Sequence, residues 1–82
     1  MAEKITYYSL TLPGRDEPTG LARRRGRDGG FRDEALGKNL EWHFSPVIVE
    51  WKRGDSTEEL QEISAEEASR LVEHFRERWK DL

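Results

Sequence analysis

The feature that most constrains the fold is an apolar stripe in the last quarter of the chain, residues 64–82. Its members recur every three or four positions, which is the spacing of one face of an α-helix, while charged residues fill the opposite side. Ser64 is a favourable N-cap, and Glu67 three residues later completes a capping box. The sequence therefore predicts an amphipathic helix of roughly 27 Å, whose apolar side the rest of the chain must cover. The stripe consists of Ala68, Leu71, Val72, Phe75, Trp79 and Leu82.

The length of 82 residues predicts a single small domain over residues 1–82. A chain of this size buries only about 60% of the surface that its unfolded form exposes. Three Trp, three Phe and two Tyr, with a net charge of only −3, nevertheless argue against disorder. The chain has no cysteine, and it contains no apolar run as long as a signal peptide or a membrane span requires. We therefore expect a cytoplasmic protein.

Residues 4–12 (KITYYSLTL) are rich in β-branched and aromatic side chains and predict a strand. Because side chains alternate along a strand, apolar groups point to both of its faces. We therefore expect each face of this strand to be at least partly covered. Ile5 and Tyr7 point one way, and Tyr8, Leu10 and Leu12 point the other.

The dipeptide Asp28-Gly29 predicts a type I′ turn that joins two strands in a β-hairpin. This turn fixes the register, because the numbers of directly opposed residues must then sum to 57. Arg25 and Arg32 would face each other as like charges, which is unfavourable unless an anion lies beside them. The other predicted pairs match in chemistry: Leu21 with Leu36, Ala22 with Ala35, Arg23 with Glu34, and Arg24 with Asp33.

The segment after the hairpin completes the predicted sheet. Residues 40–44 alternate apolar and polar side chains, as a half-buried strand does. Residues 46–53 have the Pro and Gly punctuation of a short helix but also contain three strand-forming residues in a row, so a helix is favoured and a strand is the alternative. Residues 60–63 are expected to form a short edge strand. The predicted fold is α+β: an antiparallel meander of three to four strands, packed by the C-terminal amphipathic helix, with a short additional helix.

Clustered arginines near the hairpin turn are the first candidate for an interaction surface. Arginines can bind phosphate or carboxylate groups, and nearby aromatic rings can stack on bases. Pairing with Asp33 and Glu34 across the hairpin is the structural alternative, and the acidic composition of the chain favours it over nucleic-acid binding. The cluster consists of Arg23, Arg24, Arg25, Arg27 and Arg32.

Trp42 and Trp51 are the second candidate, because an exposed tryptophan pair marks many partner sites. Burial in the core is favoured for both, since so small a chain has few other large residues. The sequence alone does not decide between these two placements.

No motif in the chain predicts catalysis, a cofactor or a metal. The two histidines, His43 and His74, lack the spacing of a zinc or catalytic site, and no phosphate loop or nucleophile motif is present. We therefore predict a non-enzyme without cofactors. An enzyme or ligand carrier would need a pocket between the sheet and the helix, lined by Tyr7 or Tyr8, His43 and Trp42.

Charge is divided unevenly along the chain, with +2 on residues 1–40 and −5 on residues 41–82. Such asymmetry is typical of a polar interaction surface. The leading prediction is a non-catalytic protein-interaction or regulatory module, acting on a partner protein or as a homodimer. A nucleic-acid-binding accessory protein that uses the arginine-rich hairpin is the alternative, and no membrane partner is expected.

The chain resembles a group of small actinobacterial proteins with no assigned activity. The resemblance covers most of residues 4–80 and depends on the segments ITYYSL and DGGFRDEAL, on the spacing of Trp42 and Pro46, and on the acidic run into residues 62–68. It implies a bacterial cytoplasmic protein and no particular chemistry.

Overall fold

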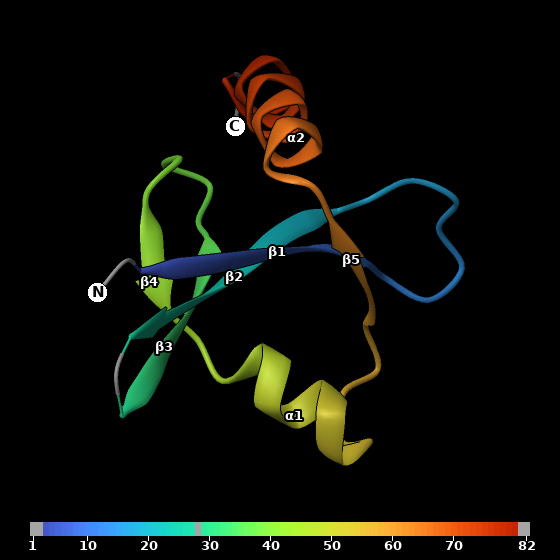
Figure 1. Ribbon diagram of the computed structural model, residues 1–82. Coiled ribbons are helices and arrows are strands. Elements are labelled where there is room, and N and C mark those ends of the chain that lie inside the picture. The colour runs from blue at the N-terminus through green and yellow to red at the C-terminus, as the bar shows by residue number, and fades with distance from the viewer. Residues whose placement is uncertain (1–2, 28, 81–82) are drawn as a thin grey trace.

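The computed structural model describes residues 3–27 and 29–80, and within them it has five strands and two helices (Figure 1). These described residues contain no helix of the length and apolar character needed to cross a membrane. In chain order the elements are β1 (Lys4–Thr11), β2 (Gly20–Arg27), β3 (Gly30–Leu36), β4 (Trp42–Phe44), α1 (Val47–Arg53), β5 (Glu59–Ile63) and α2 (Ala65–Trp79).

The strands form one antiparallel sheet in the order β4-β3-β2-β1-β5. Strands β1 to β4 are the predicted meander. The chain then passes through α1, and β5 returns to pair with the free side of β1. The α+β class and the C-terminal helix on the sheet are confirmed. The sheet has five strands, whereas three to four were predicted, because the short edge strand expected at residues 60–63 joins it.

Helix α2 covers one face of the sheet (Figure 1). The predicted stripe packs against the sheet, with Ala68 and Phe75 buried against Leu21 of β2 and Leu36 of β3. The Ser64 hydroxyl accepts a hydrogen bond from the backbone N–H of Glu67 at 3.1 Å, as an N-cap should. Leu82 of the predicted stripe lies outside the described residues. The half-buried members of this core are Tyr7, Leu40, Trp42, Ile63, Leu71, Val72 and Trp79.

Helix α1 covers the opposite face of the sheet (Figure 1). Val47 and Ile48 of α1 are buried against Tyr8 and Leu10 of β1, in a core that also contains Ala22 and Leu60. Strand β1 is therefore covered on both faces, as its apolar side chains predicted. Residues 47–53 are helical rather than extended, because Gly54 at φ 83° closes the helix in the left-handed conformation that glycine tolerates.

The predicted hairpin register is confirmed for β2 and β3, including Arg23 opposite Glu34 and Arg24 opposite Asp33. Gly29 has the positive φ of 81° that the turn requires, whereas Asp28 lies outside the described residues. The strand expected at residues 40–44 is shorter, because Leu40 at φ 64° still belongs to the preceding turn.

Candidate functional site

The arginines of the hairpin divide between the two faces of the sheet. Side chains alternate along β2, so Arg23, Arg25 and Arg27 point to the face that carries α2, whereas Arg24 points to the face that carries α1. Arg32 of β3 lies directly opposite Arg25 and shares its face. The candidate cluster is therefore not one continuous patch.

On the α2 face, Glu34 of β3 is the anion that the like-charged pair Arg25–Arg32 requires. Its carboxylate accepts hydrogen bonds from the Nε atoms of Arg23 at 2.8 Å and Arg32 at 3.1 Å, and Arg25 Nη1 lies 3.8 Å away. Arg25 also pairs with Glu3 at 3.1 Å. Glu34 is only 5% exposed, so this ion-pair network lies within the sheet surface and is partly shielded from water.

The protonation state of Glu34 follows from this network. Burial opposes ionisation and is the largest single effect on the carboxyl. The hydrogen bond and charge of Arg23, with the hydrogen bond of Arg32 and the charge of Arg25, outweigh it and hold the pKa of Glu34 below its ordinary value of 4.5. Glu34 is therefore an anion at neutral pH, and it neutralises part of the arginine charge from within.

On the α1 face, Arg24 and Asp33 form a two-pronged ion pair, with Nε–Oδ1 at 2.7 Å and Nη2–Oδ2 at 2.9 Å. The hydrogen bond to Asp33 raises the pKa of the Arg24 guanidinium. The same guanidinium lies 4.0 Å above the ring centre of Phe31. Arg23 is held in a similar way on the other face, 4.1 Å above the ring of Trp42. Arg23 and Arg24 are therefore engaged within the sheet and have little freedom to bind a partner.

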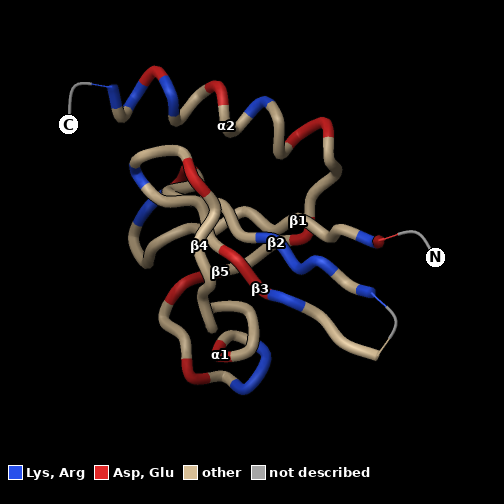
Figure 2. Tube along the Cα trace, turned by 90° about the vertical axis from the view of Figure 1, so that its left-hand side faces the viewer, with Lys and Arg blue, Asp and Glu red and all other residues tan. Residues whose placement is uncertain are grey.

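The remaining arginines lie at the tip of the hairpin, which projects beyond α1 and the start of α2 (Figure 2). Arg32 is 63% exposed at its side chain, Arg27 is exposed, and no described carboxylate pairs with Arg27. Phe44 lies on the same face as Arg32 and is 69% exposed, whereas the ring of Phe31, 58% exposed, lies on the α1 face under Arg24. We call Arg25, Arg27, Arg32 and Phe44, which share the α2 face, the hairpin surface.

A shallow cavity of about 320 Å³ opens at the hairpin surface. The arginine side chains of the hairpin surface line it together with Glu3, Phe31 and the turn glycines Gly29 and Gly30. On this end of the α2 face, Arg23, Arg25, Arg27 and Arg32 face Glu3 and Glu34, an excess of two positive charges among the described residues. The cavity brings together the guanidinium donors of three arginines, which suits an anionic group.

Trp42 and Trp51 are half-buried and belong to different cores. Trp42 packs under α2, with its ring centre 6.3 Å from that of Tyr7. Trp51 packs on the other face of the sheet, 6.1 Å from Tyr8. They form no joint surface, and the aromatic side chains that do reach solvent near the arginines are Phe31 and Phe44.

The pocket considered for an enzyme or carrier is not assembled. Neighbouring residues of β4 point to opposite faces, so Trp42 lies with Tyr7 on the α2 face, whereas His43 lies on the α1 face. His43 is exposed and its Nε2 is 3.2 Å from Asn39 Oδ1. His74 is exposed on α2. Within residues 3–27 and 29–80, no group of three metal-ligating side chains is placed to hold a metal.

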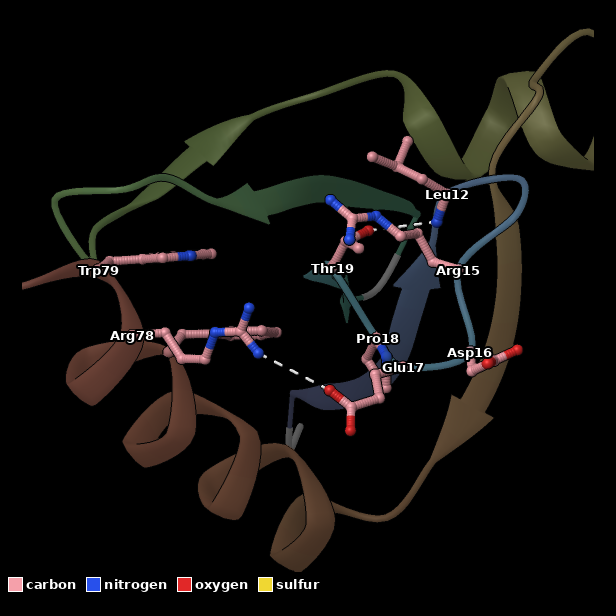
Figure 3. Close-up of a pocket in the computed structure, with 9 residues that line it drawn as sticks. Leu12, Arg15, Asp16, Glu17, Pro18, Thr19, Arg78 and Trp79 are labelled. Atoms are coloured by element: carbon pink, nitrogen blue, oxygen red, sulfur yellow. Dashed lines mark hydrogen bonds and ion pairs between the residues drawn. The ribbon is translucent and has the colours of Figure 1, made fainter.

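A second cavity, of about 450 Å³, lies between the loop after β1 and the end of α2 (Figure 3). Leu12, Thr19 and Trp79 contribute to its wall, and Arg78 of α2 reaches across to Glu17 at 3.7 Å. The four charged residues that line this cavity, Arg15, Asp16, Glu17 and Arg78, have no net charge, so the cavity lacks the excess positive charge of the hairpin surface.

Sequence reasoning identified the arginines but missed Phe31 and Phe44. The alternation of residues 40–44 placed Phe44 on the inner side with Trp42, and the side is correct. Phe44 is nevertheless exposed, because the α2 core ends at Trp42. The like-charged pair Arg25–Arg32 was the available signal that a carboxylate had to lie nearby.

Comparison of the chain with protein-family models, with curated proteins and with solved structures found no match. The resemblance to small actinobacterial proteins therefore stays a prediction, and the functional argument depends on the geometry of the hairpin surface.

Proposed function

We propose that this protein is a non-catalytic interaction module whose hairpin surface binds an acidic segment of a partner protein. The observation that carries the proposal is the placement of Arg25, Arg27 and Arg32 at the projecting end of the sheet, with exposed Phe44 on the same face. Arginine and aromatic side chains are enriched at protein interfaces, where they supply most of the binding energy.

The mixed chemistry of the surface favours a polypeptide over a nucleic acid. The ring of Phe44 offers apolar contact on the same face as the guanidinium groups, which suits a segment with both carboxylates and apolar side chains. Glu3 and Glu34 lie among the arginines and would repel a continuous phosphate backbone. The net charge of −3 also disfavours a polyanion.

Nucleic-acid binding is the second candidate, because exposed aromatic rings beside arginines can stack on unpaired bases. It predicts affinity for a single-stranded oligonucleotide that falls steeply with salt. A short acidic peptide and an oligonucleotide, tested side by side, separate the two candidates.

The direct test is fluorescence anisotropy with a labelled peptide in which aspartate and glutamate alternate with valine. Arg27→Gln should weaken binding by about twofold to fivefold, since it removes an exposed charge from the surface. Glu3→Gln should strengthen binding, because it frees Arg25 from an internal partner. The matched control is Arg76→Gln, which removes the same charge from the exposed side of α2 and should leave the affinity unchanged.

Equal binding by the Arg27→Gln and Arg76→Gln variants would show that the peptide is attracted by general charge, and would refute the proposed surface. Tighter binding of the oligonucleotide than of the peptide, with the same response to these variants, would favour the nucleic-acid candidate instead.

A further inference from the structure

We infer that the acidic partner segment binds as an added strand along the free edge of β4, an inference that rests on the function proposed above. Strand β4 ends the sheet on the side opposite β5. Figure 2 looks at the molecule from this side, and β4 lies at the front with α2 above it and α1 below it. Neither helix crosses the strand edge in this view.

The hydrogen bonds between β3 and β4 show which backbone groups of β4 are open. The N–H of Ser45 donates to the carbonyl of Asp33 at 3.1 Å, and the N–H of Gly37 donates to the carbonyl of Glu41 at 2.9 Å. In an antiparallel pair, every second residue bonds to the neighbouring strand and those between point away. The N–H and C=O groups of Trp42 and Phe44 therefore point to the open edge.

These backbone groups are the template that an extended segment needs. Added strands gain affinity from main-chain hydrogen bonds and specificity from alternate side chains. Proteins commonly protect exposed edges with charged side chains. The three residues of β4 (Trp42, His43 and Phe44) include no carboxylate or lysine, and the protection of this edge is limited to the shortness of the strand and the exposed Glu41 before it.

The two edge strands of the sheet, β4 and β5, differ in charge. Strand β5 carries Glu59 and Glu62, both exposed, and would repel an acidic segment. Beside β4, Phe44 lies directly opposite Glu34, which Arg32 contacts from two residues away on the same face. A segment laid along β4 with alternating residue types would direct its carboxylates to the α2 face, which carries Arg32, and its apolar side chains to the α1 face beside His43.

The test compares the acidic peptide with the same peptide methylated at alternate backbone nitrogens, prepared in each of the two alternations. Methylation removes N–H donors and leaves the side-chain charges in place. If the segment adds to β4, one alternation should bind at least about threefold more weakly than the other, since only one set of N–H groups faces the strand. Amide hydrogen exchange should show that Trp42 and Phe44 gain protection when the unmethylated peptide binds.

A matched pair of variants tests the protein side. Phe44→Pro removes the outward N–H, which makes no bond to β3, whereas Phe44→Ala removes the same ring and keeps the N–H. Phe44→Pro should bind about twofold to tenfold more weakly than Phe44→Ala.

The possible failures are distinguishable. If every peptide binds equally and Trp42 and Phe44 stay unprotected, the hairpin surface binds acidic segments but the added strand is refuted. If no peptide binds, the proposed function fails and this inference fails with it. If Trp42 and Phe44 are protected at high protein concentration without peptide, a second copy of the chain occupies the edge, and the inference is overturned.

Discussion

Replacing Glu34 by glutamine tests whether the carboxylate at the centre of the arginine network stabilises the fold. The change keeps the size of the side chain but leaves Arg23, Arg25 and Arg32 together without their shared anion. The bond from Arg23 is part-buried and charge-assisted, and such bonds contribute about 1.5–3 kcal/mol. Arg32 is 63% exposed, so water screens its pair to less than about 1 kcal/mol. Relief of the cost of burying a charge offsets part of this loss.

We therefore expect Glu34→Gln to lower the free energy of unfolding by about 1–2 kcal/mol at pH 7, equivalent to a fall in Tm of about 4–16 °C for a domain of this size. The measurement is thermal and urea unfolding, followed by tryptophan fluorescence and circular dichroism. The control is Glu59→Gln, which neutralises an exposed carboxylate on β5 and should change stability by less than about 0.5 kcal/mol.

The pH dependence gives an independent check on the same residue. Because the pKa of Glu34 is lowered in the folded state, its stabilisation is fully present above its ordinary value of 4.5 and is lost as the pH falls below it. The difference in free energy of unfolding between the native chain and Glu34→Gln should therefore shrink as the pH falls below 4.5. A difference that is absent at pH 7, or that stays constant down to pH 3, would contradict the role assigned to Glu34.

Three further changes test the packing and the helix ends. Phe75 is 2% exposed, so Phe75→Ala should lower the free energy of unfolding by about 3–5 kcal/mol and leave little folded protein. Phe44 is 69% exposed, so Phe44→Ala should change it by less than about 0.5 kcal/mol. Equal effects of the two changes in urea unfolding would refute the assigned core. Gly54→Ala should cost about 1 kcal/mol because φ is 83° there, whereas Gly26→Ala, which meets only an ordinary contact with a backbone oxygen at 3.7 Å, should cost less. Ser64→Ala should cost about 1 kcal/mol by removing the cap of α2, and unchanged helix content and Tm would show that the cap is not needed.

Local patterns explain why much of the fold could be predicted. The register of β2 and β3 follows from the turn at Gly29, and the inward side of α2 follows from the spacing of residues such as Phe75. The helix end at Gly54 follows from the backbone freedom of glycine. Each of these features depends on residues close together in the sequence, so the sequence alone determined them.

The candidate site depended on contacts between distant parts of the chain. Arg23, Arg24 and Arg32 are the same residue type, yet Trp42 and Asp33 hold Arg23 and Arg24 against the sheet. Arg32 lies at the hairpin tip and remains 63% exposed while it pairs with Glu34. The exposure of the arginines and of Phe44 was decided by how far α1 and α2 extend over each face, because a helix shields only the side chains beneath it. That coverage is a property of tertiary packing, and no repeating pattern within the strands encodes it.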